Sequence, residues 1–254
     1  MSEQVKSLVK AMSVLEYLSG YPNGAPLQDI AEATGINKTS VHRMLATFED
    51  LGYISQPASN KEYRLTLKLL HIGHSAMSSE VIGVIKPILN LLMEALNETI
   101  NFISREGDQI VFRDKFEPQS SSFRTRTFVG MYSPMYCSAA GKCFLAFSTP
   151  EEQENYWLRN QSMVKKLTEN TIVDKALFLQ ELAKVKQRGY AIDDEENEVG
   201  ISCTAVPVFD SSGIPAYVVS ISTLTPRLRA IGYEVLATKI KQTTGQLEQS
   251  LFKQ

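Results

Sequence analysis

The residues between 38 and 43 combine side chains that can bind a polyanion. They supply two cations, one imidazole and two hydroxyl groups: Lys38, Arg43, His42, Thr39 and Ser40. A rotation of about 100° per residue puts most of them on one side of a helix that begins after Asn37, a good N-cap. Arg43 could hydrogen-bond guanine through both arms of its guanidinium, and the first helical turn offers free N–H groups to phosphate. Such a face suits the major groove of DNA, although an isolated charged face is more often simply solvated.

Three predicted helices form the frame around this face. The spacing of apolar residues predicts a first helix from Val5 to about Leu18, a second over 26–33 and a third over 38–51. Glycines that can end a helix follow each of them, namely Gly20, Gly35 and Gly52. Five apolar residues lie opposite the polar face of the third helix, and we expect them to pack on the first two helices: Val41, Met44, Leu45, Phe48 and Leu51.

A β-hairpin is predicted directly after the third helix. Residues 53–56 and 62–65 are short strand-like runs on either side of a loop rich in turn residues. Three helices followed by a hairpin are the order of a winged helix-turn-helix, in which Lys61 and Arg64 would contact the DNA backbone or minor groove. The whole pattern therefore favours binding to double-stranded DNA over a merely solvated helix face.

The composition limits how such contacts are made. The chain has 254 residues, a formal net charge of −2 and 43% hydrophobic residues, as an ordinary globular protein has. Its first eighty residues contain seven Lys and Arg against eight Asp and Glu, so DNA binding would depend on a few well-placed cations. The sequence shows neither a secretory signal nor an uninterrupted apolar span, and its three cysteines are an odd number. We therefore expect free thiols, a cytoplasmic location and no membrane contact.

The rest of the chain alternates between helical and strand-like patterns. A helix over 66–78 is predicted to link the DNA-binding domain, residues 1–65, to a second domain over 81–254, with the boundary at 78–80. In the second domain we predict helices over 81–96, 138–147, 151–159, 174–188 and 227–252. The predicted strands cover 99–105, 110–117, 190–193, 203–209 and 216–222. Strands grouped as hairpins with helices packed against them indicate an α+β fold.

Enzymatic readings of the second domain fit its residues poorly. A phosphate-binding loop ending at Gly141-Lys142 would need glycine at 136 and a hydroxyl at 143, where Tyr136 and Cys143 stand. No histidine follows residue 74, so the usual base for a serine or cysteine nucleophile is missing. The cysteines at 137, 143 and 203 form no CxxC pair that would suit zinc. We therefore predict no catalytic residue, no metal and no cofactor.

Several motifs in the first domain resemble those of the IclR family of bacterial transcriptional regulators. They are Leu27-Gln28-Asp29-Ile30-Ala31 with Thr34-Gly35, Lys38 to Leu45, Leu51-Gly52-Tyr53 and Tyr63-Arg64-Leu65. The resemblance continues in the second domain through Gly130, Pro134, Ser138 to Lys142, Gly189-Tyr190-Ala191, Asp193 to Glu196, Gly200, Cys203, Pro207-Val208 and Ser220-Ile221-Ser222. The match spans essentially the full chain, and several motifs in one order are far more specific than any one alone.

The resemblance implies a GAF-like α/β domain that binds a small organic acid, and homodimers or homotetramers. Carried over by position, the effector would contact Ala139, Ala140, Asp193, Cys203, Ser220 and Ser222. Ser138 opens the same helix, where we expect it to cap the helix rather than act as a nucleophile, and Asp193 would fit a ligand hydroxyl better than a bare carboxylate. Ser133, with Ser122 and Thr125 nearby, hints at a hydroxyl-rich ligand such as a sugar acid. We expect a solvated acidic loop at Asp194, Glu195, Glu196 and Glu198.

These observations predict a transcriptional regulator, with repression as the expected outcome, controlled by a small organic-acid or sugar-acid effector. One alternative is a metabolite hydrolase or transferase with an appended DNA-binding domain, which would turn over its ligand. Another is an adaptor that uses the helix-turn-helix fold to bind protein, which would show no salt-dependent affinity for DNA.

Overall fold

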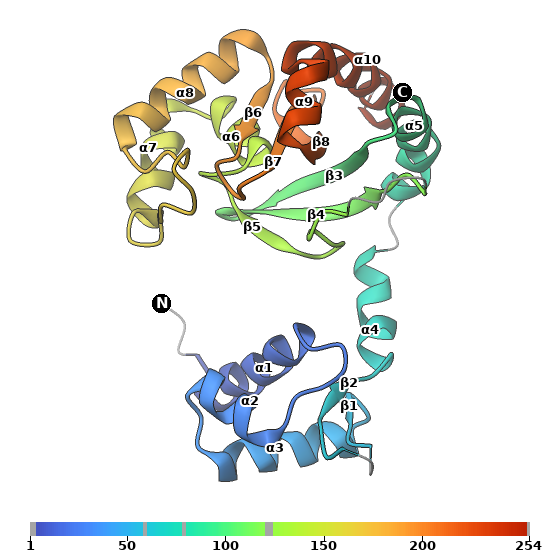
Figure 1. Cartoon of the computed structure of the whole chain (residues 1–254), viewed down its shortest axis with the longest axis vertical. Helices are drawn as coiled ribbons and strands as arrows, with labels where there is room; N and C mark the ends of the chain where they lie inside the picture. Colours follow the sequence, from blue (N-terminus) through green and yellow to red (C-terminus); the bar gives the residue numbers. More distant parts are fainter. Residues whose placement is uncertain (1–3, 58–59, 78–79, 120–123, 253–254) are drawn as a thin grey trace. The chain divides into compact units, whose positions relative to one another are not determined.

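Residues 4–57, 60–77, 80–119 and 124–252 are described by the computed structural model of the chain. The chain divides into two units, Met1–Ser79 and Glu80–Gln254 (Figure 1). Within the described ranges, no helix combines the length and the apolar character needed to cross a bilayer.

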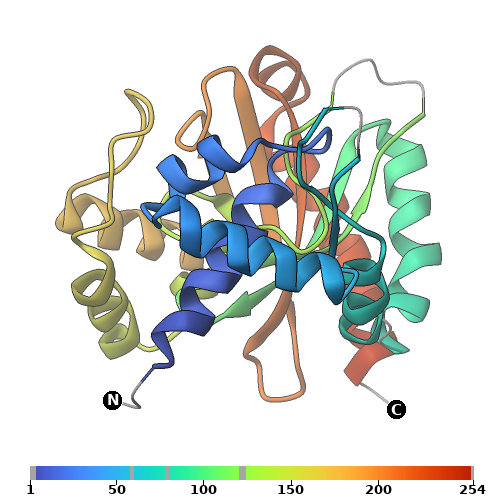
Figure 2. The ribbon, with the colours of Figure 1, turned by 90° about the horizontal axis from the view of Figure 1, so that it is seen from below.

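The amino-terminal unit contains the predicted winged helix-turn-helix. Its elements are α1 (Lys6–Ser19), α2 (Leu27–Thr34), α3 (Lys38–Asp50), β1 (Ile54–Ser55), β2 (Arg64–Leu65) and α4 (Lys68–Met77). Asn37 caps α3, because its side-chain oxygen accepts a hydrogen bond from the Ser40 N–H at 2.8 Å. Gly35 ends α2 in the left-handed conformation that glycine adopts without strain. Figure 2 looks onto α3, which runs along the outside of this unit.

The core of this unit follows part of the predicted pattern. Val41 and Leu45 of α3 are buried, and Met44 and Phe48 pack partly against the same core. Leu51 was predicted to pack there as well, but its side chain is 51% exposed because it lies at the C-cap, beyond the last turn of α3. The apolar residues with helical spacing in and just before α1 differ in burial. Val14, Leu15 and Leu18 are buried, whereas Val5, Leu8, Val9 and Met12 are exposed.

The carboxy-terminal unit is built on a six-stranded antiparallel sheet with the strand order β5-β4-β3-β8-β7-β6. Its strands are β3 (Thr99–Glu106), β4 (Gln109–Phe116), β5 (Tyr132–Pro134), β6 (Ala191–Asp194), β7 (Ile201–Phe209) and β8 (Pro215–Leu224). Its helices are α5 (Glu80–Leu96), α6 (Ala139–Ala146), α7 (Pro150–Asn160), α8 (Lys175–Arg188), α9 (Thr225–Ile231) and α10 (Tyr233–Phe252).

Helices cover both faces of this sheet, which creates two hydrophobic cores. One core joins one face of the sheet to α6, α7 and α8, and contains Ile103, Ala205 and Val218. The other joins the opposite face to α5, α9 and α10, and contains Phe102 and Val219. Neighbouring residues of one strand, such as Phe102 and Ile103, therefore serve different cores. The layers are visible in Figure 1 and confirm the predicted α+β class.

Two elements of this unit differ from their prediction. The single helix predicted over 227–252 is two helices, because Gly232 between them has a φ of 95° that interrupts the helical backbone. Strand β5 was not predicted, since it has only three residues and ends at Pro134. It pairs with β4 through Ile110 and Ser133, and this pairing brings Ser133 to the sheet.

The close approach of α6 to the chain before it gives a first prediction, for Gly141→Ala. A Cβ atom at position 141 would lie 2.2 Å from the Met135 Cα and 2.3 Å from the Met135 carbonyl oxygen, so the backbone must shift. We expect the variant to lose about 1–3 kcal/mol of unfolding free energy, measured by urea denaturation. Gly245→Ala in α10 is the matched control, because nothing lies within 4 Å of its new Cβ. Equal unfolding midpoints for the two variants would contradict the close contact.

Candidate functional site

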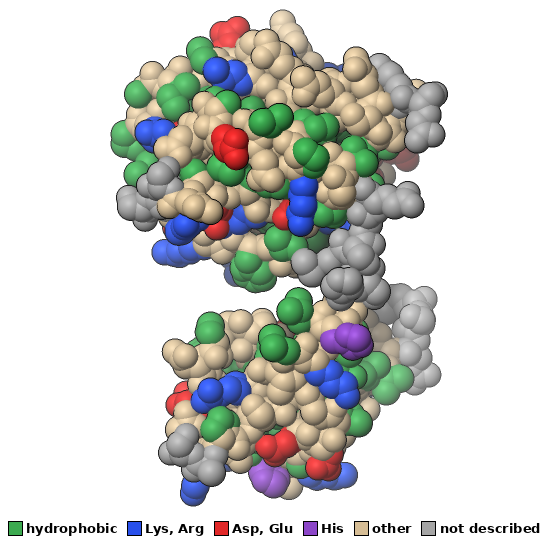
Figure 3. Space-filling view, turned by 90° about the vertical axis from the view of Figure 1, so that its right-hand side faces the viewer, with side chains coloured by type: hydrophobic (Ala, Val, Ile, Leu, Met, Phe, Trp, Pro, Cys, Tyr) green, Lys and Arg blue, Asp and Glu red, His purple; other side chains and the backbone are tan. Residues whose placement is uncertain are grey.

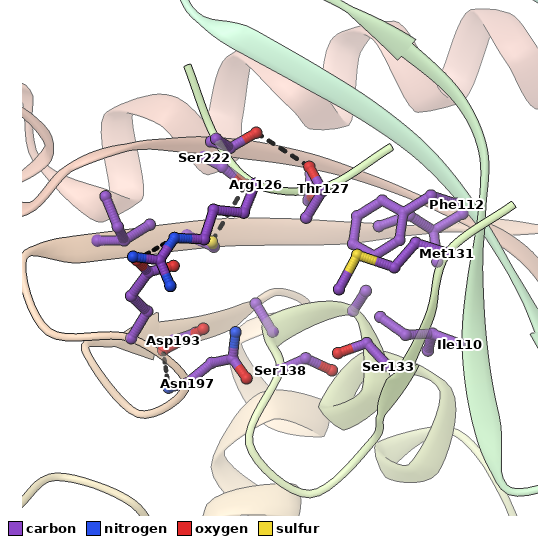
Figure 4. A pocket seen from close by; sticks show the side chains of 18 of the residues that line it. Ile110, Phe112, Arg126, Thr127, Met131, Ser133, Ser138, Asp193, Asn197 and Ser222 are labelled. Atoms are coloured by element: carbon purple, nitrogen blue, oxygen red, sulfur yellow. Dashed lines mark hydrogen bonds and ion pairs between the residues drawn. The ribbon is translucent and has the colours of Figure 1, made fainter. Parts of the chain in front are cut away.

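A cavity of about 520 Å³ lies in the carboxy-terminal unit between the sheet, the start of α6 and the segment 124–131 (Figure 4). Every residue predicted to contact an effector lines this one cavity: Ser133, Ser138, Ala139, Ala140, Asp193, Cys203, Ser220 and Ser222. They come from β5, the start of α6, and strands β6, β7 and β8. The structure thus brings together side chains that are up to 89 positions apart in the sequence.

The register of the sheet explains this convergence. Ser222 of β8 pairs with Cys203 of β7, and Cys203 pairs with Asp193 of β6, so the three residues form one row across the strands. Ser220 lies two residues from Ser222 and therefore on the same face. Further along the sheet the cavity wall becomes apolar at Ile103, Ile110, Phe112 and Met131. The cavity therefore has one polar end and one mostly apolar end, where Ser133 lies beside Ile110.

Asp193 is the buried acid of the polar end. Its side chain is 4% exposed, and its Oδ1 accepts hydrogen bonds from the N–H groups of Glu196 at 2.7 Å and Asn197 at 3.4 Å. Burial raises the pKa of this carboxyl to about 7, although the nearby Lys142 opposes the rise. Near neutral pH, Asp193 can therefore either donate a hydrogen bond to a ligand or accept one.

A fully buried ion pair lies next to Asp193. The Lys142 ammonium of α6 donates to Glu196 Oε1, and both side chains are almost completely buried. Asp194 is also engaged, because it accepts hydrogen bonds from Arg229, Tyr233 and Ser202. The expected solvated acidic loop is therefore wrong for Glu196, whose carboxylate is buried against Lys142. The Asp194 side chain is 41% exposed although it pairs with Arg229.

The start of α6 forms another wall of the cavity. Ser138 is the N-cap, as expected, because its Oγ accepts from the Gly141 N–H at 3.1 Å and donates to the Pro134 carbonyl at 3.0 Å. Ala139 and Ala140 follow it and are buried at the cavity wall. Small side chains here leave room for a ligand beside the positive end of the helix.

The segment 124–131 encloses the cavity on a further side. Lys115 of β4 anchors this segment, because its ammonium donates to the carbonyls of Thr125 at 3.2 Å and Thr127 at 2.7 Å. Arg126 lies 3.4 Å from Glu198 Oε1, and this ion pair joins the segment to the loop after β6. Both Arg126 and Glu198 line the cavity. Thr125 also lines the cavity, whereas Ser122 lies outside the described residues.

The thiols near the cavity are held in the neutral form. Burial raises the pKa of Cys203 well above its ordinary value and raises the pKa of Cys137 to about 12. The Cys203 thiol donates to Ser222 Oγ at 3.1 Å. These cysteines therefore lack the thiolate that a nucleophile needs.

The predicted DNA-contacting residues have different exposures. Lys38, Thr39, His42 and Arg43 of α3 are exposed, and Ser40 is half-buried. In the hairpin, Lys61 is exposed whereas Arg64 is half-buried, with an Nε that has no hydrogen-bond partner among the described residues. On the face of this unit that Figure 3 shows, Lys and Arg side chains are scattered among acidic and uncharged ones. This distribution agrees with the near-zero charge of the first eighty residues.

Comparisons with known proteins match both units. The family model of the IclR helix-turn-helix domain matches residues 7–58, and that of the bacterial transcriptional regulator IclR C-terminal domain matches residues 73–249. The chain belongs to the IclR family. It is 41% identical to the DNA-binding transcriptional repressor YiaJ of Escherichia coli K12 over 97% of this chain and 88% of that protein.

Other members support the same assignment for this IclR-family protein. The transcriptional regulator KdgR of Escherichia coli K12 is 31% identical over 89% of this chain and 84% of that protein. The crystal structure of Thermotoga maritima IclR is 28% identical, with a TM-score of 0.75 over 98% of this chain and 99% of that one. The crystal structure of an IclR transcriptional regulator from Alicyclobacillus acidocaldarius has a TM-score of 0.81 and 29% sequence identity, over 97% of this chain and 98% of that one.

The family membership makes this IclR-family protein a transcriptional regulator rather than an enzyme. The individual contacts of the predicted residues with DNA and effector stay predictions. Sequence reasoning missed several residues at the cavity, including Arg124, Arg126 and Asn197. The run Arg124-Thr125-Arg126-Thr127 alternates cations and hydroxyl groups, but it lies outside the strands and all four residues line the cavity, so this alternation gave no usable signal.

Proposed function

We propose that this IclR-family chain is a repressor that binds operator DNA through α3 and the β1–β2 hairpin, under the control of a small organic acid or sugar acid bound in the cavity. The observation that carries the proposal is the single cavity lined by all eight expected effector residues. Relatives named as repressors, including YiaJ of Escherichia coli, support the direction of control. The protein would act in the cytoplasm, where the DNA is.

The chemistry of the cavity supports a hydroxylated acid as the effector. Its polar end supplies hydroxyl groups from Ser220 and Ser222, the Asp193 carboxyl and the cationic Arg126. An acid bearing hydroxyl groups uses all three kinds of partner. The cavity is also within the size range of small-molecule sites.

A homodimer or homotetramer would complete the function. The exposed apolar residues Leu8, Val9 and Met12 of α1, with Val5 at its N-cap, support an α1-mediated contact between copies. Two copies would place two α3 helices on half-sites of a palindromic operator. An effector that favours one arrangement of these helices by about 1–3 kcal/mol would change operator affinity about 5- to 150-fold.

Operator binding gives a prediction for Arg43→Ala. The experiment first selects a preferred duplex from a random pool with the full chain, and then measures binding to it at fixed salt. We expect the variant to bind about 1–3 kcal/mol more weakly and to lose its preference at one base pair in each half-site. Lys10→Ala on α1 is the control, since this residue is outside the predicted DNA contacts. An equal loss for Arg43→Ala on unrelated DNA would show that the guanidinium contacts only phosphate.

Effector binding is tested separately with a thermal-shift screen of small organic and sugar acids. We expect at least one acid to stabilise the full chain without being turned over, and to change binding to the selected duplex. Asp193→Ala should remove this response while preserving DNA binding without ligand. An unchanged dose response in the variant would exclude Asp193 from the effector site.

A further inference from the structure

We propose that Asn101 sets the hydrogen-bond polarity of the cavity, so that Ser222 faces the effector as a donor, Ser220 beside it can donate as well, and the two hydroxyls select the carboxylate of a hydroxy acid. Asn101 acts as a positioning residue behind the two serines. The inference deepens the proposed function and rests on it, because it assigns a ligand chemistry to the same cavity.

The position of Asn101 follows from the sheet. It lies on β3 directly opposite Ser220 of β8 and is fully buried. Its Nδ2 donates to Ser220 Oγ at 3.3 Å and to Ser222 Oγ at 3.1 Å. Its Oδ1 has no hydrogen-bond partner within the described part of the chain. This buried amide therefore contacts both cavity serines.

The Asn101 amide limits the hydrogen bonds that the two serine hydroxyls can still form. A side-chain amide nitrogen carries two hydrogen atoms, and here each is given to one serine oxygen. Ser222 Oγ also accepts from the Cys203 thiol at 3.1 Å, so both of its lone pairs are occupied. The Ser222 hydroxyl can then only donate, and the acceptor it needs must come from the cavity that it lines.

The two serines together fit a carboxylate. Both Oγ atoms lie within 3.3 Å of the same nitrogen, close enough for the two oxygens of one carboxylate to accept from both hydroxyls. At the other end of the row across the strands, Asp193 fits a hydroxyl of the same ligand. An acid with a hydroxyl group thus matches the row at both ends. A neutral polyol has no carboxylate, the group that accepts hydrogen bonds without donating any.

Reversing the polarity at position 101 separates these two ligand classes. In Asn101→Asp the new side chain accepts from the serine hydroxyls, and the serine lone pairs then face the ligand. A carboxylate cannot donate to them, so we expect its dissociation constant to rise about 10- to 100-fold. A polyol hydroxyl can donate as well as accept, so we expect polyol binding to be unchanged or tighter.

The experiment uses calorimetry on the full chain with three acid and polyol pairs of equal carbon number: tartrate and threitol, xylonate and xylitol, gluconate and glucitol. We expect the unmodified chain to prefer at least one acid to its polyol, and Asn101→Asp to lose or reverse that preference. Thr204→Val is the matched control, because Thr204 is fully buried on the opposite face of the same sheet and its Oγ1 has no partner among the described residues. The control should keep the preference.

Two serine variants test the same role if Asn101→Asp does not fold. Ser220→Ala and Ser222→Ala each remove one donor, and each should weaken acid binding by a larger factor than polyol binding. An unchanged acid preference in the folded Asn101→Asp protein, or in both serine variants, would overturn the role of Asn101. Failure of all three acids to bind the unmodified chain would overturn the assigned ligand class. Retained binding to the selected duplex would then show that the DNA-binding function still stands.

Discussion

Lys142→Met should lower the unfolding free energy of the carboxy-terminal unit by about 3–5 kcal/mol, because it leaves a buried carboxylate without its cation. Lys142 and Glu196 have side chains that are 1% and 8% exposed, so water can replace neither partner. Glu196 Oε2 already lacks a hydrogen-bond partner within the described residues, which leaves Lys142 as its main compensation. Trp157 is the chain's single tryptophan and is buried in this unit, so its fluorescence during urea denaturation measures the loss.

Two further variants separate the buried pair from an ordinary surface pair. Lys166→Met breaks an exposed pair with Glu169, and we expect it to cost less than about 1 kcal/mol. Lys142→Met combined with Glu196→Leu removes both charges, and should recover most of the stability lost in the single variant. A loss below 1 kcal/mol in Lys142→Met alone would mean that water reaches Glu196.

The ion pair between Lys142 and Glu196 could not be predicted from the sequence. The run from Asp194 to Glu198 has the composition of a solvated loop, and only the fold brings Lys142 to Glu196 across 54 positions. Asn101 was missed for a related reason, because its role depends on a pairing with β8 more than a hundred residues away. Local patterns carry no information about such distant partners.

Features that depend on local sequence were predicted well. Asn37 and the apolar spacing after it define α3, and Ser138 caps α6 as expected. The resemblance to a known family pointed to six of the residues that line the cavity, and reasoning from individual positions added Ser133 and Ser138. Spacing supported the shared face of Ser220 and Ser222. The split at Gly232 was missed because glycine is tolerated inside many helices, so its positive φ could not be inferred from composition.

Asp193 should make the carboxy-terminal unit less stable as the pH rises. A carboxyl group with a pKa of about 7 in the folded chain and about 4 in the unfolded chain keeps its proton in the folded state over that interval. The folded state then binds more protons than the unfolded state, so the unfolding free energy falls with increasing pH. We expect the unfolding free energy to fall by about 3 kcal/mol between pH 5 and pH 8. Urea denaturation monitored by the fluorescence of Trp157 measures this loss.

Asp193→Asn tests this assignment because it removes the titrating group but preserves its shape. Burial also raises the pKa of Glu196, which contributes in the same direction, so the variant should reduce the pH dependence without abolishing it. The carboxyls of Asp108 and Glu152 have lowered pKa values, and their effect therefore falls below this pH range. If the unmodified chain and Asp193→Asn lose the same stability between pH 5 and pH 8, Asp193 is ionised in the folded protein throughout. A carboxylate effector would then face a fixed negative charge at the polar end of the cavity, and its own charge would have to be balanced by Arg126 and the serine donors.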